Sequence, residues 1–234
     1  MNKVSSQSAS GPVRKVRLSR QSLHERVADD LRDRIITGQL EPGQKLAVNL
    51  LAEEIGVSLT PLREALKLLA AESLIDLTPN RGASVSLVTI QQTRDLFEVI
   101  AGLEALAAEL ATERMTDDDL ADLQDLHAQM KHHAADVSRE NYFALNRRIH
   151  DRIVDFARNP ILSTQRGRLA QQAERVRFIA LNNDTRRDTA MQEHFDLMAA
   201  FSAGDAELAH RIWRNHLIAS GKQTIELLAQ SADL

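Results

Sequence analysis

Hydrophobic residues recur at helical spacing on both sides of Gly56. Before the glycine, Leu51, Ala52 and Ile55 fall on one face of a short helix, and glycine commonly ends such a helix. After it, Pro61 suits the first turn of a second helix. One face of that second helix is formed by Leu62, Ala65, Leu66 and Leu69. The pattern therefore predicts a helix-turn-helix.

The opposite face of the second predicted helix is polar. Thr60, Arg63 and Lys67 share it at helical spacing. A hydroxyl, a guanidinium and an ammonium can donate hydrogen bonds to phosphates and to the acceptor edges of bases in a DNA major groove. Taken alone, the segment is equally consistent with two ordinary amphipathic helices, so the DNA-binding interpretation depends on the flanking sequence.

The segment after the helix-turn-helix alternates between apolar and polar residues. Residues 74–77 and 83–87 follow this pattern on either side of a polar turn. One face of the resulting hairpin is predicted to hold Ile75, Leu77, Ala83, Val85 and Leu87. At the tip, Arg81 can reach a minor groove or phosphates, and Gly82 permits close approach of the backbone. The hairpin is therefore expected to be the wing of a winged helix.

The pattern after the wing is helical throughout. Helices are expected to begin at Thr89 and Thr116 and to span residues 138–157, 161–181, 187–202 and 206–229. The fold is thus expected to be mainly α, with a winged helix-turn-helix at residues 21–88. Residues 89–234 are expected to form an antiparallel bundle of about six helices.

Composition and charge agree with two domains that differ in their ligands. The chain has 234 residues, no cysteine and no apolar run of membrane-spanning length, so a cytoplasmic protein without a membrane partner is expected. Residues 1–88 hold 12 Lys and Arg against 10 Asp and Glu, whereas residues 89–234 hold 17 against 23. Five of the basic residues fall in residues 1–20, which are expected to form a disordered basic tail.

Three histidines and one asparagine are the candidate ligands of the predicted helical bundle. Asn146 and His150 lie one turn apart on an apolar stripe, and His194 and His216 fall on the apolar stripes of two other helices. Buried polar groups need partners, and a metal ion would supply a common one. The alternative is that each is a hydrogen-bonded core residue. The other histidines are expected to be at the surface or hydrogen-bonded: His24, His127, His132, His133 and His210.

The N-terminal pattern resembles the winged-helix domain of the GntR family of bacterial transcription regulators. The turn of that family usually reads Ser-Arg-Thr-Pro-Val-Arg-Glu-Ala-Leu, and residues 58–66 here read Ser-Leu-Thr-Pro-Leu-Arg-Glu-Ala-Leu. The resemblance implies that five positions contact DNA: Ser58, Thr60, Arg63, Arg81 and Gly82. Leu59 replaces an arginine that commonly contacts DNA in the family.

The C-terminal pattern resembles the ligand-binding domain of the FadR subfamily, called FCD. In many FCD members, one Asp and three His coordinate a divalent metal that helps to bind a small carboxylate effector. The matching positions here are Asn146, His150, His194 and His216. Asn146 stands where Asp is usual, so the resemblance implies a site with weaker affinity for hard cations and a preference for a Zn or Ni type ion.

The sequence therefore predicts a dimeric transcription regulator, most simply a repressor, that binds an inverted-repeat operator and responds to a small-molecule effector. One alternative is a metal-free regulator that binds an apolar or acyl ligand. Another is a metal-dependent hydrolase. The hydrolase is disfavoured because no carboxylate is expected beside the histidines, and Glu193 is expected to point elsewhere. Four arginines on one helix are candidates for pairing an effector carboxylate, although most of them are expected at the surface: Arg166, Arg168, Arg175 and Arg177.

Overall fold

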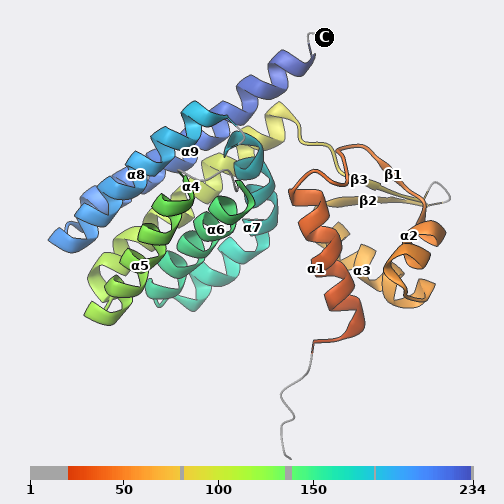
Figure 1. Ribbon diagram of the computed structural model, residues 1–234, viewed down its shortest axis with the longest axis horizontal. Coiled ribbons are helices and arrows are strands. Elements are labelled where there is room, and N and C mark those ends of the chain that lie inside the picture. The colour runs from red at the N-terminus through yellow and green to blue at the C-terminus, as the bar shows by residue number, and fades with distance from the viewer. Residues whose placement is uncertain (1–20, 80–81, 135–138, 182, 233–234) are drawn as a thin grey trace, which may run out of the picture.

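The protein consists of two helical domains joined by a short linker (Figure 1). The computed structural model describes residues 21–79, 82–134, 139–181 and 183–232. The basic tail predicted for residues 1–20 lies outside these ranges. Within them the chain is mainly α-helical, as expected, and the strands are confined to the N-terminal domain.

The N-terminal domain is a winged helix. Its elements are α1 (Leu23–Ile36), β1 (Lys45–Leu46), α2 (Val48–Ile55), α3 (Leu59–Ala71), β2 (Ile75–Thr78) and β3 (Gly82–Val85). The strands form one antiparallel sheet in the order β1-β3-β2. Strand β1 was not expected from the sequence, because two residues are too few to show an alternating pattern.

The helix-turn-helix forms where the hydrophobic pattern places it. Gly56 ends α2 with a φ of 76°, in the left-handed region that glycine adopts without strain. Ser58 then takes the N-cap position of α3. The apolar face of α3 is buried, as predicted, through Leu62, Ala65, Leu66 and Leu69. This packing against α1 fixes the orientation of α3 in the domain.

The predicted wing is a hairpin of β2 and β3, but its buried face is shorter than the alternation implies. Ile75 lies opposite Val85 and Leu77 lies opposite Ala83. Ile75, Ala83 and Val85 are buried, whereas Leu77 is 45% exposed. Leu87 lies beyond the end of β3 and is 60% exposed. The apolar side chains at both ends of the predicted face therefore remain accessible.

The C-terminal domain is a bundle of six helices within the described residues, as predicted. They are α4 (Ile90–Arg114), α5 (Asp117–Ala134), α6 (Arg139–Phe156), α7 (Pro160–Leu181), α8 (Asp184–Ala203) and α9 (Ala206–Ala232). The long helices α4 and α9 pack closely along each other. A Cβ atom at Gly221 would lie 2.8 Å from Cγ of Phe97, so this crossing requires glycine.

The two domains touch through α1 and α7. Ile36, at the end of α1, is 3% exposed and belongs to the hydrophobic core that the helical domain otherwise forms. A second contact joins Arg147 of α6 to Asp33 of α1, with 3.7 Å between Nη1 and Oδ1. Among the described residues, no helix is long and apolar enough to cross a lipid bilayer.

Candidate metal centre and nucleic-acid interface

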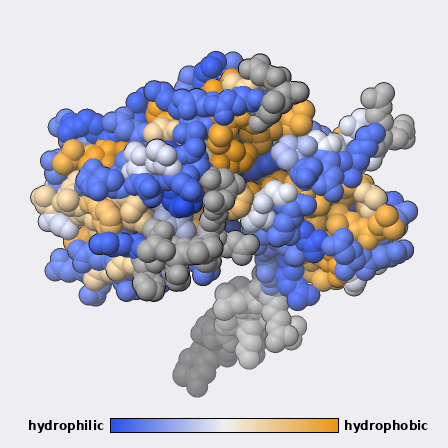
Figure 2. All heavy atoms as spheres, turned by 45° about the horizontal axis from the view of Figure 1, so that its top comes forward, coloured by the Kyte–Doolittle hydropathy of each residue, from blue (hydrophilic) through white to orange (hydrophobic). Residues whose placement is uncertain are grey.

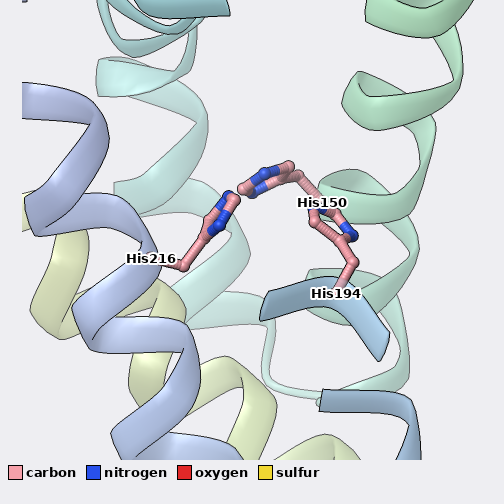
Figure 3. Close-up of side chains that lie close together, drawn as sticks. All are labelled: His150, His194 and His216. Atoms are coloured by element: carbon pink, nitrogen blue, oxygen red, sulfur yellow. The ribbon is translucent and has the colours of Figure 1, made fainter. Parts of the chain in front are cut away.

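The three predicted histidines meet in the centre of the helical domain. His150 comes from α6, His194 from α8 and His216 from α9, and their rings turn toward one another (Figure 3). One ring nitrogen from each lies within 4.8 Å of the others. All three side chains are buried. The fold thus brings together three imidazoles that are at least 22 residues apart in the sequence.

The outer nitrogen of each ring is held by a partner. Nδ1 of His150 lies 2.5 Å from Oε2 of Glu104, and Nδ1 of His216 lies 2.7 Å from Oε2 of Glu193. Nδ1 of His194 lies 3.0 Å from Nε2 of His127. Histidines that bind metals usually donate their other N–H to such groups, which orients the ring. The contacts therefore suit rings whose Nε2 atoms face a metal ion.

His127 also fixes the tautomer of His194. Its Nδ1 lies 2.7 Å from the carbonyl oxygen of Leu123, which can only accept a hydrogen bond, so Nδ1 of His127 donates. Burial lowers the pKa of His127 to about 4, so the ring is neutral and its Nε2 accepts the N–H of His194. The lone pair of His194 is then on Nε2, which is buried and has no hydrogen-bond partner among the described residues.

Asn146 lies one turn before His150 and is 1% exposed. Neither its amide oxygen nor its amide nitrogen has a hydrogen-bond partner in the described part of the chain, and the same is true of Nε2 of His150. Buried polar atoms without partners are rare, because each costs about 1–3 kcal/mol. An amide oxygen and three imidazole nitrogens form a donor set that fits a Zn or Ni type ion. The unpaired atoms therefore support the predicted ligand set.

The imidazoles at this centre are in the charge state that metal binding needs. Burial lowers the pKa of His194 and His216 and, together with the nearby Arg177 guanidinium, lowers that of His150. All three rings are accordingly neutral near pH 7, and a neutral ring has a nitrogen lone pair free for a cation.

The expectation that no carboxylate accompanies the histidines is wrong. Glu104 of α4 is fully buried, and its Oε1 lies 3.1 Å from Nε of Arg166 and 3.2 Å from Nη1 of Arg177. Burial raises the pKa of Glu104, but the hydrogen bond from His150 and the positive charges of the two arginines outweigh it and hold the pKa well below its usual range. Glu104 is therefore an ionised group that links one histidine to two arginines.

Glu193 also lies at the centre, although it was expected to point elsewhere on α8. Its Oε2 accepts a hydrogen bond from Nη2 of Arg186 at 2.8 Å as well as contacting His216. Both glutamates are thus engaged by imidazoles and guanidiniums, which suits them to orient ligands. The hydrolase was disfavoured because no carboxylate was expected beside the histidines, and that reason no longer holds. Neither glutamate is placed as a free general base, however, so the structure does not favour a hydrolase.

Most of the four arginines expected at the surface are buried. Arg166, Arg175 and Arg177 are no more than 5% exposed, and only Arg168 is exposed. Arg166 pairs with Glu104 and, at 2.5 Å, with Oδ1 of Asp151. The sequence pattern of α7 did not reveal the burial of Arg166 and Arg177, because their carboxylate partners lie on α4 and α6.

The remaining histidines mostly agree with the prediction. His210 contacts Oε2 of Glu109 at 2.8 Å, and His24 lies 3.3 Å from the hydroxyl of Ser22. The structure does not describe the side chains of His132 and His133, so the prediction for these two residues is untested. His127 is hydrogen-bonded, as expected, but it belongs to the centre, which the sequence did not indicate.

The candidate DNA contacts lie on α3 and at the wing. Ser58, Thr60 and Arg63 are exposed at the start of α3, and Arg63 makes no ion pair with any described residue. Lys67 on the same face pairs with Glu64 at 2.8 Å. Gly82 begins β3 with a φ of 89° and is exposed. Arg81 lies outside the described residues, so its predicted position at the wing tip is untested.

A winged helix with an exposed basic residue on its recognition helix, joined to a helical domain with buried ligand donors, defines the class of two-domain DNA-binding regulators. Comparison with known protein families identifies both parts. Residues 23–85 match the family described as bacterial regulatory proteins, gntR family, and residues 95–219 match the FCD domain. The chain therefore belongs to the GntR family of transcription regulators and has the FCD domain of the FadR-type subfamily.

Individual relatives agree with this assignment. The chain is 32% identical to the transcriptional repressor GlaR of Escherichia coli, over 80% of this chain and 89% of GlaR. It is 30% identical to the E. coli transcriptional regulator McbR, over 80% and 85% of the two chains. The solved structure of E. coli McbR/YncC superposes with a TM-score of 0.75 over 90% of this chain and 99% of that one, at 28% identity. These relatives are transcription regulators rather than enzymes.

Proposed function

We propose that this regulator is a repressor whose affinity for its operator is controlled by a small carboxylate effector. The effector would bind in the helical domain beside a divalent metal ion held by Asn146, His150, His194 and His216. The observation that supports this most is that the Nδ1 atom of each imidazole has a partner while one ring nitrogen of each lies within 4.8 Å of the others. Similarity to the repressor GlaR supports the direction of regulation.

The residues at the centre have two roles in the proposed binding: some supply donor atoms and others orient the rings. Three neutral imidazoles and one neutral amide oxygen supply the donor atoms, while Glu104 and Glu193 orient two of the rings. When bound, the ion supplies an electron-pair acceptor for a carboxylate oxygen of the effector. Arg177 and Arg186 lie 3.1 Å and 3.4 Å from the outer Nδ1 atoms of His150 and His216, so their positive charges stand behind these two rings.

The proposed regulator acts as a homodimer on an inverted repeat. One winged helix contacts few bases, and two copies related by a two-fold axis double the sequence that is read. The effector changes operator affinity only if it binds one arrangement of the domains better than another. The contacts of α1 and α6 with the other domain provide a route for that coupling.

Replacing Arg63 with Ala is expected to weaken operator binding by roughly 1–3 kcal/mol, which is a loss of about 5-fold to 150-fold in affinity. Arg63 is exposed on α3 without an ion pair, so its guanidinium is available to a base or a phosphate. Fluorescence anisotropy with a DNA fragment from the regulator's own promoter measures the change. Arg168→Ala removes an equal charge from an exposed position of the helical domain and should leave affinity unchanged. Equal affinity of both variants would exclude Arg63 as a DNA contact.

Replacing Asn146 with Asp is expected to tighten metal binding by about tenfold, the scale on which changes around a metal act. The carboxylate adds a negative charge to a donor set that otherwise consists of neutral groups. Competition with a chromophoric chelator, using zinc and nickel in turn, measures the affinity. Asn146→Ala is the matched control and should bind more weakly than wild type. An Asp variant that binds no better than the Ala variant would remove residue 146 from the ligand set.

A further inference from the structure

A cavity lies between the two domains, apart from the histidine centre. Its volume is about 670 Å³, and its walls come from the end of α3, strand β2, the linker at residues 86–89, and helices α4 and α7. None of the metal donors and none of their hydrogen-bond partners line it. Figure 2 shows hydrophobic surface in the furrow between the domains. Volumes of about 300–1,000 Å³ are typical of small-molecule sites.

A buried cation faces this cavity without a direct ion pair among the described residues. Arg175 is 4% exposed, and its Nη1 donates a hydrogen bond to the carbonyl oxygen of Ser86 at 2.8 Å. Its Nη2 has no hydrogen-bond partner, and the side chain forms no ion pair within 4.0 Å among the described residues. By contrast, the buried Arg166 and Arg177 both pair with Glu104. A buried charge without a partner is costly, which makes Arg175 a candidate anion ligand.

The surroundings of Arg175 add a second polar group and an apolar wall. Oγ1 of Thr93 is buried in the same lining and also lacks a hydrogen-bond partner. The apolar wall is formed by Leu96, Val99 and Leu169. Burial lowers the pKa of Arg175 to about 10, although Asp76 raises it, so the guanidinium remains charged at neutral pH.

We propose that this cavity binds an amphiphilic monocarboxylate, with its carboxylate on Arg175 and Thr93 and its apolar body against Leu96, Val99 and Leu169. A single negative charge is favoured because Asp76 and Asp95 also line the cavity and repel a doubly charged phosphate. Because both domains line the cavity, the ligand stabilises this arrangement of the DNA-binding domain. This site is independent of the metal centre proposed above.

Calorimetric titration of the full-length protein with octanoate tests the proposal. Wild type is expected to bind octanoate but not octylamine, which has the same apolar body and the opposite charge. Arg175→Met should weaken octanoate binding by at least about tenfold, because it removes the charged hydrogen bond and keeps the length of the side chain. Val99→Trp should block the cavity from a position that is 54% exposed in wild type and therefore tolerant of a larger side chain.

The histidine centre provides the control for location. Octanoate binding should persist in a His150→Ala, His194→Ala double variant. Absence of binding to wild type, equal binding to wild type and to both cavity variants, or loss of binding only in the histidine variant would each overturn the proposal. The cavity could instead be filled by a second copy of the chain, and sedimentation of wild type and Val99→Trp tests this. A wild-type protein that binds no octanoate and is a dimer, but dissociates in the Val99→Trp variant, would show that a second copy fills the cavity.

Discussion

Replacing Glu104 with Ala is expected to lower the free energy of unfolding by about 3–5 kcal/mol, because it removes the anion that three buried groups share. Arg166, Arg177 and His150 all contact this carboxylate, and none of the four side chains has appreciable access to water. Domains of ordinary stability unfold with about 5–15 kcal/mol, so the loss is a large part of the total. Urea unfolding followed by circular dichroism measures it.

The matched control is Glu98→Ala, an exposed glutamate on the same helix. This variant also replaces a glutamate with alanine but leaves the buried network intact. It should therefore change the free energy of unfolding by no more than about 0.5 kcal/mol. A Glu104→Ala protein as stable as this control would mean that the arginines find other partners or reach solvent.

Elemental analysis of tag-free protein is expected to find about one divalent ion per chain in wild type and none in a His150→Ala, His194→Ala double variant. Two of three imidazole donors are lost in the variant, and the remaining His216 and Asn146 cannot hold an ion alone. A His24→Ala, His210→Ala variant removes two histidines outside the centre and should retain the metal.

The opposite result has an equally direct interpretation. If folded wild-type protein purified without chelators contains no metal, the centre does not bind an ion when the neutral Asn146 replaces a carboxylate. The histidines would then act as hydrogen-bonded core groups, and the search for an effector would turn to apolar or acyl ligands in the helical domain.

The extent of sequence-based prediction differs between the two domains. In the winged helix, Gly56 and the apolar face of α3 determine local structure, so the helix-turn-helix could be predicted from neighbouring residues. Strand β1 could not, because its two residues are fixed by pairing with β3 rather than by any pattern of their own. Local patterns predict elements well where the element is long enough to repeat them.

At the histidine centre, periodicity indicated which side chains face inward but not what each one meets. Asn146 and the three histidines at this centre were found in this way, whereas Glu104 and His127 were not. Each of these two groups contacts a partner at least 46 residues away along the chain. A signal for Glu104 does exist in the sequence: it lies among alanines on the apolar side of α4, where an unpaired carboxylate would be too costly.

The burial of Ile36 in the core of the helical domain has a consequence for the entropy of DNA binding. Because α1 is fixed against α7, the orientation of the recognition helix relative to the bundle is set when the chain folds. A DNA-binding domain on a free tether would lose this rotational freedom only on meeting its operator, and its affinity would be lower by that amount. A ligand that loosens Ile36 would restore the freedom and release the operator without touching a single DNA contact.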